Sequence, residues 1–182
     1  MDEYGKVIGE GAVRFERVLP GPIERVWAYL TESDKRAEWL AGGEMEPREG
    51  GAVELRFLHA ELTPYDEVIP DKHRGCENGA VVRGTITRWE PPHALAFTWD
   101  EATGRDSEVT IELRREGDAV RLELTHRRLD DRSLMLDVAS GWHTHLGILA
   151  ARLKGGTPPP FWEVHTAMEG AYEARISQAR PA

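Results

Sequence analysis

Three histidines occupy positions that the local pattern turns toward an apolar interior. His59 and His126 each continue the inward phase of a predicted strand, and His145 lies about 20° from Val138 on a predicted helix, at the edge of its apolar stripe. An imidazole in such a place could hydrogen-bond a ligand, bind a metal or shuttle a proton. The alternative is a histidine whose ring is satisfied by a backbone carbonyl.

The spacing of the possible metal ligands argues against a metal site. His143 and His145 diverge by about 200° on a helix, so they cannot hold one ion together. Neither an HExxH motif nor paired cysteines occur. The chain also lacks a GxGxxG motif, a Walker loop and a nucleophile elbow. We therefore expect no metal and no cofactor, and we assign no catalytic residue.

Two further residues could take part in chemistry. Arg17 falls on the inward face of the first predicted strand, where an unpaired charge would be costly. It could pair with an acidic side chain at the end of the sheet or bind the carboxylate of a ligand. Cys76, the only cysteine, follows Lys72, His73 and Arg74, whose charges could make its thiol more reactive. An unremarkable surface thiol is the alternative.

Hydrophobic periodicity predicts the elements that position these residues. Alternation predicts a first strand over Ala12 to Leu19, followed by one helix after Pro22 and a second from Asp34 to Leu40 with Ser33 as N-cap. Further half-polar strands joined by short turns indicate an antiparallel meander. These strands cover residues 53–57, 82–87, 95–99, 109–114 and 120–125.

Helical spacing predicts a long helix from Ser133 to Leu153 and an amphipathic segment from Phe161 to Ile176. Between the strands, His59 to Gly79 is about 20 residues of irregular sequence, a length typical of a lid or an ordered insertion. Phe161 and Trp162 must be buried, either on their own domain or in a homodimer formed through this tail.

Composition limits the class of protein. The chain has 182 residues, a net charge of -9 and 40% hydrophobic residues, which predicts one globular domain and disfavours nucleic acid as a partner. We expect a flexible N-terminus over 1–10, the domain over 11–156, and a Pro-rich spacer with a helical tail over 157–182. With neither a signal peptide nor a membrane span in the sequence, we expect a cytoplasmic protein.

Several short stretches resemble a known family. PIERVWAYLT (Pro22 to Thr31), followed by EWL (Glu38 to Leu40), resembles the opening of the activator of heat-shock-protein-90 ATPase homologue family, in the START and birch-pollen-allergen-like (SRPBCC) superfamily. GWHTHL (Gly141 to Leu146) is similar to the bacterial branch. The resemblance covers roughly Val13 to Gly155.

The resemblance implies an α+β helix-grip fold, in which a curved antiparallel sheet of about six strands wraps around a long C-terminal helix. Members of the superfamily bind lipids, sterols and polyketides, and a minority are enzymes. The eukaryotic namesake stimulates a chaperone ATPase in the stress response. A shared fold does not by itself decide between these roles.

We therefore expect the chain to bind a small hydrophobic or amphipathic molecule, lipid-like or polyketide-like, between the sheet and the long helix. The alternatives are a co-chaperone-like partner of a heat-shock ATPase and a cyclase- or hydrolase-type enzyme that uses the same cavity. The residues expected to contact the ligand are Phe57, His59, Phe97, Trp99, His126, Trp142, His145, Leu146 and Arg17.

Overall fold

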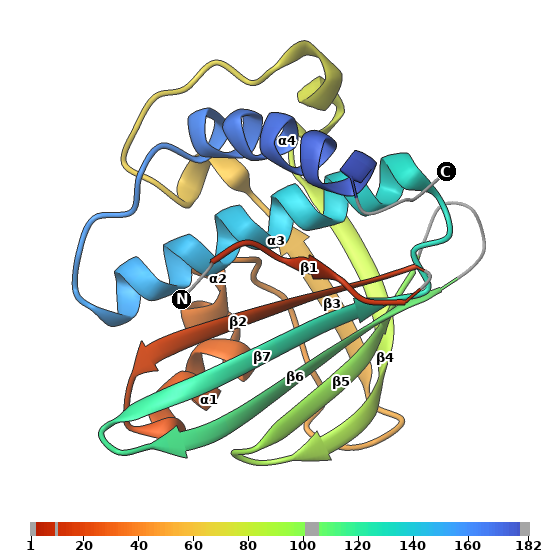
Figure 1. Cartoon of the computed structure of the whole chain (residues 1–182). Coiled ribbons are helices and arrows are strands. Elements are labelled where there is room, and N and C mark those ends of the chain that lie inside the picture. The colour runs from red at the N-terminus through yellow and green to blue at the C-terminus, as the bar shows by residue number, and fades with distance from the viewer. Residues whose placement is uncertain (1–2, 10, 101–105, 179–182) are drawn as a thin grey trace.

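One curved sheet of seven antiparallel strands wraps around a long helix (Figure 1). This computed structural model describes residues 3–9, 11–100 and 106–178, and every structural statement below concerns those residues. The strands are hydrogen-bonded in the order β1-β2-β7-β6-β5-β4-β3. Their bounds are β1 Lys6–Val7, β2 Ala12–Pro20, β3 Ala52–Phe57, β4 Ala80–Glu90, β5 Ala94–Trp99, β6 Ser107–Glu116 and β7 Ala119–Arg127.

Helices lie at one end of the sheet and across its concave face. Two short helices follow β2, the long helix α3 follows β7, and α4 packs on α3 (Figure 1). Two 3-10 helices, η1 and η2, lie between β3 and β4, in the segment for which we expected irregular structure. The bounds are α1 Ile23–Thr31, α2 Ser33–Ala37, η1 His59–Glu61, η2 Asp71–Cys76, α3 Arg132–Leu153 and α4 Phe161–Gln178. The predicted α+β helix-grip fold is confirmed.

The sheet has one strand more than the sequence suggested. Lys6 and Val7 pair with Arg14 and Val13 of β2 and form the edge strand β1, inside the stretch expected to be a flexible N-terminus. Two residues are too few for an alternating pattern to be visible, because a period of two needs several repeats.

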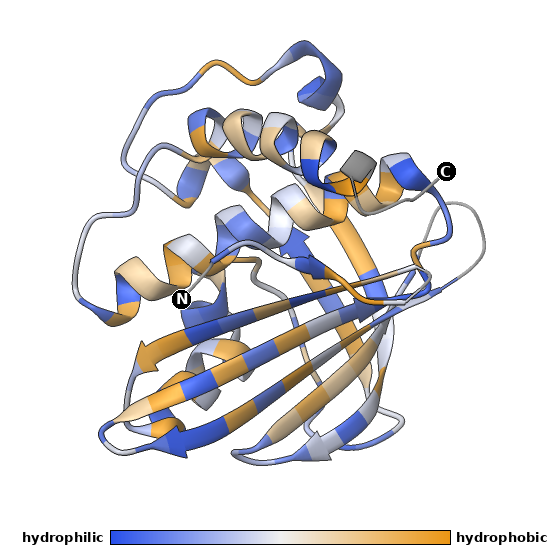
Figure 2. Ribbon diagram, viewed as in Figure 1, coloured by the Kyte–Doolittle hydropathy of each residue, from blue (hydrophilic) through white to orange (hydrophobic). Residues whose placement is uncertain are grey.

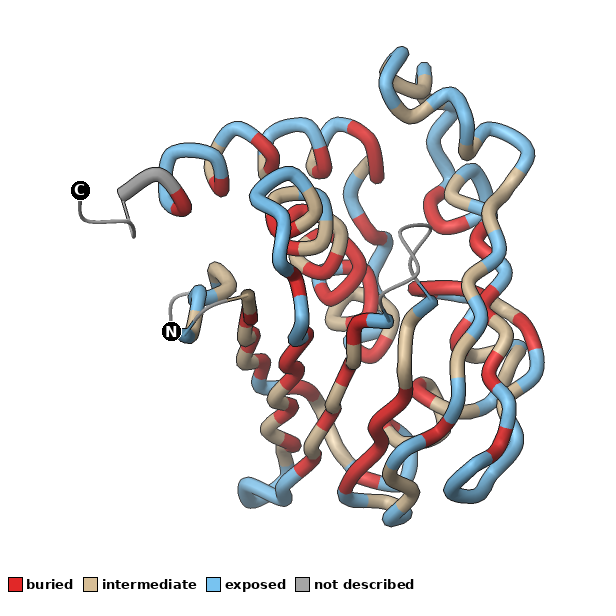
Figure 3. Tube along the Cα trace, turned by 90° about the vertical axis from the view of Figure 1, so that its right-hand side faces the viewer, coloured by how far each residue is buried: buried red, intermediate tan, exposed pale blue. Residues whose placement is uncertain are grey.

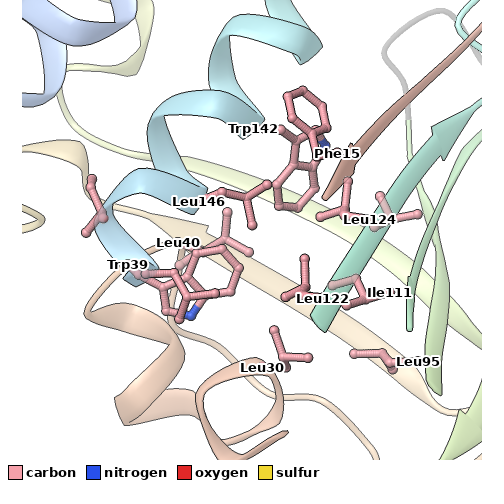
Figure 4. Close-up of a cluster of buried hydrophobic side chains, with 14 of the residues drawn as sticks. Phe15, Leu30, Trp39, Leu40, Leu95, Ile111, Leu122, Leu124, Trp142 and Leu146 are labelled. Atoms are coloured by element: carbon pink, nitrogen blue, oxygen red, sulfur yellow. The ribbon is translucent and has the colours of Figure 1, made fainter. Parts of the chain in front are cut away.

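The other strands follow the alternation in the sequence. Along β6, buried and half-buried positions alternate from Ser107 to Leu113, and Figure 2 shows the same alternation as bands of colour along the strands. The buried side faces α3, which lies between the sheet and α4 (Figure 3). Trp142 and Leu146 point from α3 toward the strand residues Leu122 and Leu124 (Figure 4). This part of the interior is a packed core.

The long helix begins with a side-chain cap. The carboxylate of Asp131 accepts hydrogen bonds from the backbone N–H groups of Ser133 (2.8 Å) and Leu134 (3.0 Å), which would otherwise have no partner within the helix. The helix ends at Leu153, before Gly155 with φ +71°. The predicted bounds were therefore one residue short at the N-terminus.

The prediction for the second short helix was wrong at both ends. Ser33 is its first residue instead of the N-cap, and its hydroxyl accepts a hydrogen bond from Gly43 N–H at 3.0 Å. The helix ends at Ala37, and the chain on both sides of it is held by the buried guanidinium of Arg36. It donates to the carbonyls of Thr31 (2.9 Å), Ala41 (3.0 Å) and Gly43.

Strands β4 and β5 approach closely at Gly84. A Cβ atom on this residue would lie 1.7 Å from the carbonyl oxygen of Thr98, so only glycine fits without moving the backbone. Next to it, the hydroxyl of Thr98 accepts a hydrogen bond from Thr85 N–H at 2.9 Å. This contact fixes the chain one residue before Trp99, which reaches the cavity described below.

The C-terminal helix belongs to the same packed unit. Phe161 and Trp162 are 2% and 6% exposed, so both aromatics are buried within their own chain. Of the two alternatives for these aromatics, burial on their own domain is the one observed, and a homodimer stays a prediction. Among the described helices, none combines the length and the apolar character that crossing a membrane requires.

Candidate functional site

A cavity of about 290 Å³ lies at one end of the sheet, under α3 and α4. The strand register brings its sheet residues together, since Phe57 pairs with Ala80, Trp99 with Ser107, and His126 with Val109. The segment between β3 and β4 closes it on another side. It is lined by Leu40, Phe57, His59, His73, Cys76, Ala80, Trp99, His126, Asp137, Val138, Gly141, Trp142, His145, Phe161, Trp162 and His165.

Rings dominate this wall, because ten of the sixteen lining residues are aromatic or histidine. They contact one another closely. The centroids of Trp99 and Trp142 are 5.8 Å apart, and the ring of His59 lies 4.7 Å from that of Phe161 and 5.3 Å from that of Trp162. Edge and face contacts of this kind hold the rings in fixed orientations, so the cavity has a defined shape.

Six of the nine residues expected to contact a ligand line this cavity. They are Phe57, His59, Trp99, His126, Trp142 and His145. The remaining three, Phe97, Leu146 and Arg17, do not form part of its wall.

Phe97 and Leu146 are 3% and 0% exposed and belong to the packed core. Arg17 points inward as expected but lies too far along β2: Val13 is the residue that pairs with His126, and four residues further is about 13 Å. Its guanidinium donates to the carbonyl of Glu16 at 2.8 Å.

His126 is a buried histidine with both ring nitrogens engaged. Trp142 Nε1–H donates to its Nδ1 at 3.0 Å, and its Nε2 lies 2.7 Å from the hydroxyl of Ser107. Because an indole can only donate, Nδ1 carries no proton, and Nε2–H donates to Ser107. Burial lowers the pKa of His126 to about 3, so the ring is neutral at physiological pH. It offers a ligand a ring surface and no free nitrogen.

His145 keeps one nitrogen available. Its Nδ1 lies 2.8 Å from the carbonyl oxygen of Trp39, which can only accept, so Nδ1 is the protonated nitrogen. Burial, followed by the nearby His59, lowers the pKa of His145 to about 3. The neutral ring therefore has Nε2 as a hydrogen-bond acceptor.

His59 has a buried ring nitrogen, Nδ1, without a hydrogen-bond partner among the described residues. Burial, followed by the nearby His73, lowers its pKa to about 4. Its centroid lies 5.7 Å from that of His145, and the ring is stacked on Phe57. His59 and His145 are thus neighbouring polar groups in the wall of the cavity.

A second polar cluster, which the sequence did not predict, borders the cavity beside α4. Oε1 of Glu169 lies 2.6 Å from Lys72 Nζ, 3.1 Å from His73 Nε2 and 3.7 Å from His165 Nδ1. Burial alone would raise the pKa of Glu169, but the hydrogen bonds from Lys72 and His73 outweigh it and hold the pKa below its ordinary value. Burial lowers the pKa of His165 to about 4, so its approach to Glu169 is not an ion pair at neutral pH.

One signal in the sequence could have pointed to this cluster. His165 and Glu169 are four residues apart on a predicted helix, a spacing that places them on one face. Their partner His73 is 96 residues from Glu169, and no pattern in its own segment indicates the pairing.

A family model matches most of the chain. Residues 20–154 match the model described as Activator of Hsp90 ATPase homolog 1-like protein. The chain belongs to this family. The match is nearly the same stretch for which the sequence resemblance was noted, and it includes strands β3 to β7 and α3.

Solved structures extend the similarity of this Activator of Hsp90 ATPase homolog 1-like chain beyond the matched stretch. The protein encoded by gene BPP1335 of Bordetella parapertussis is 50% identical with a TM-score of 0.81, covering 96% of this chain and 91% of that one. CalU16 from Micromonospora echinospora is 23% identical with a TM-score of 0.67, covering 96% and 95%. No curated protein matches the chain.

The Bordetella protein also matches the part of this chain that contains α4. The family model ends at residue 154, which leaves 182 − 154 = 28 residues outside it. The 4% of the chain that the Bordetella protein leaves uncovered is too little to contain this tail, so that protein has an equivalent of most of it. The helix that supplies Phe161, Trp162 and His165 is therefore shared with that relative.

Proposed function

We propose that this protein binds a small aromatic or otherwise hydrophobic molecule carrying at least one polar group, in the cavity between the sheet end, α3 and α4. The observation that carries the proposal is the cavity itself, about 290 Å³ and lined mainly by rings. A packed core of this size is expected to have few voids larger than a water molecule. An apolar cavity of about 150 Å³ holds benzene, so this one has room for a molecule of about two rings.

The two convergent histidines support a ligand with a hydroxyl or another donor group. His59 Nδ1 is buried and unpartnered among the described residues, and the tautomer of His145 leaves Nε2 as an acceptor. A ligand hydroxyl placed between them would satisfy a buried polar atom, and a purely apolar ligand would not. The rings provide most of the contact area, and the histidines provide orientation.

Binding accounts for these histidines better than catalysis does. A general acid or base works best when its pKa is near the operating pH. The pKa values of His59 and His145, about 4 and about 3, lie far below neutrality because both rings are buried. Both rings are therefore neutral at pH 7 and poor general acids. A chaperone partner and a cytoplasmic location stay predictions.

A panel of one-ring and two-ring aromatic molecules, each with and without a hydroxyl group, tests the proposal by thermal shift. We expect two-ring hydroxylated compounds, such as 2-naphthol, to raise the melting temperature more than naphthalene does, because only a hydroxyl group can form a hydrogen bond with Nδ1 of His59. A panel in which no compound changes the melting temperature would contradict the proposal.

A further inference from the structure

His73, His165 and Glu169 bring three metal-ligating atoms to one place. Each contributes one atom, and these atoms lie within 4.8 Å of one another. Oε1 of Glu169 is 3.1 Å from Nε2 of His73 and 3.7 Å from Nδ1 of His165. Ligand atoms of a tetrahedral Zn²⁺ ion stand about 3.4 Å apart, given bonds of about 2.0–2.1 Å. The two separations bracket that value and the third, between the two imidazole nitrogens, is at most 4.8 Å, so rotations of the side chains would bring the three atoms to one ion.

A second observation points to a ligand at this place. His165 is 6% exposed, and its Nδ1 has no hydrogen-bond partner in the described part of the chain. Buried polar atoms are nearly always paired, and an exception calls for an unseen partner such as a water or an ion. Nδ1 of His165 is also the nitrogen nearest the carboxylate of Glu169, itself 7% exposed. A buried carboxylate beside an unpartnered imidazole nitrogen is a suitable environment for a cation.

We propose that His73, His165 and Glu169 bind a divalent transition-metal ion in the wall of the cavity. Two imidazoles with one carboxylate is a donor set that Zn²⁺ accepts, and hard cations that prefer oxygen ligands would not favour it. Both histidines line the cavity, so the remaining coordination positions of the ion would be within reach of a ligand oxygen. The ion can be titrated in the absence of any organic ligand, so this proposal and the proposed function can fail separately.

Lys72 is the competitor of the metal. Its ammonium lies 2.6 Å from Oε1 of Glu169, the same oxygen that lies nearest the two histidine nitrogens. The side chain is 56% exposed, so it can move into solvent when an ion arrives. This arrangement predicts that Lys72 lowers the affinity for the metal, which a site built from other residues would not show.

The expectation of no metal was based on spacing within single elements. Here η2 supplies His73, while α4 supplies His165 and Glu169 four residues apart. Such a set resembles no contiguous motif, because two segments distant in sequence must fold together before it exists.

Isothermal titration of the full, tag-free chain with ZnCl₂ tests the site. We expect one Zn²⁺ per chain, at least tenfold weaker binding in Glu169→Gln and His165→Phe, and severalfold tighter binding in Lys72→Met. His165→Phe keeps the ring that stacks on Phe161 and should remain folded. His93→Gln removes an exposed histidine outside the cavity, and it should bind Zn²⁺ as the wild type does.

Absorption spectra of the Co²⁺ form identify the ligands. We expect visible bands typical of nitrogen and oxygen ligation that disappear in Glu169→Gln. A wild-type chain that binds no Zn²⁺ at micromolar concentration, or variants that all bind equally, would overturn the proposal. A thiolate-to-cobalt band would place the ion at Cys76 and would overturn it too.

Discussion

The indole N–H of Trp142 donates a hydrogen bond to Nδ1 of His126 across 3.0 Å, in a buried contact between α3 and β7. The contact joins the long helix to the sheet at the edge of the cavity, which both residues line. It exists only while Nδ1 has a free lone pair, since an indole cannot accept in return. The neutral state of one histidine is therefore a condition for this helix–sheet contact.

Stability should consequently fall with acidification. The pKa of His126 is about 3 in the folded chain, because of burial, and about 6.5 when unfolded. The unfolded chain binds the proton more readily, so the contribution of His126 is fully present above about pH 6.5 and is lost as the pH falls toward 3. Between those limits the slope is about 1.4 kcal/mol per pH unit for this one group.

The variant His126→Gln isolates that contribution. Its amide provides one acceptor and one donor but does not titrate between pH 3 and 7. Urea unfolding of both proteins at several pH values from 4 to 7 should show a smaller loss of stability for the variant. Equal losses in the two proteins would mean that His126 is not the group responsible.

Replacing His59 should separate stability from binding. His59→Phe keeps the stacking on Phe57 and removes a buried nitrogen that has no partner among the described residues. We expect the free energy of unfolding to rise by about 1 kcal/mol, because an unsatisfied buried polar group is costly. Affinity for 2-naphthol should fall, because the hydroxyl loses a hydrogen-bond partner.

The same substitution at His126 is the control. His126→Phe leaves Trp142 N–H without a partner, so it should destabilise the chain. Chemical denaturation measures both changes. A His59→Phe variant less stable than the wild type would show that its imidazole has a structural partner.

Arg36 should be among the most sensitive positions outside the cavity. The side chain is 1% exposed and satisfies carbonyl groups of Thr31, Ala41 and Gly43, which fixes the loop that carries Trp39 and Leu40. Removing the guanidinium in Arg36→Met leaves these carbonyls without their donor, and we expect a loss of about 3 kcal/mol in the free energy of unfolding.

Lys35 on the same helix provides the comparison. It forms only an exposed ion pair with Glu32, so Lys35→Met should change the urea midpoint far less. Similar midpoints for the two variants would contradict the role given to Arg36.

The sequence was sufficient for strands β2 to β7 and for α3, because these elements depend on repeated patterns. Strands such as β6 alternate over several residues, and the apolar stripe of α3 runs for more than five turns. The antiparallel order then brings the ends of β3, β5 and β7 together. For this reason, six candidate residues chosen from the periodicity of the sequence line the same cavity.

The other half of the site depends on contacts that no periodicity describes. His73 comes from η2 and His165 from α4, and both contact Trp162. The Trp162 ring stacks on His73 with centroids 5.1 Å apart and packs edge-on against His165 with centroids 5.6 Å apart. Arg17 lies outside the cavity wall for a different reason. The alternation along a strand predicts which face a residue occupies, and it does not tell how far along the sheet a cavity lies.

We propose above that the cavity between α3, α4 and the sheet end is a binding site. Two glycines of α3 allow this proposal to be tested directly. Gly141 lines the cavity and Gly147 is exposed, and a Cβ atom added to either would meet nothing within 4 Å. Leucine at either position should raise helix propensity by up to about 1 kcal/mol, so both variants should fold. Only Gly141→Leu should fill the cavity.

The decisive measurement is a titration of the wild type, Gly141→Leu and Gly147→Leu with 2-naphthol, followed by quenching of tryptophan fluorescence. We expect saturable one-to-one binding to the wild type and Gly147→Leu, with at least tenfold weaker binding to Gly141→Leu. Equal binding to all three proteins would contradict the proposal, because the ligand would then lie outside the cavity.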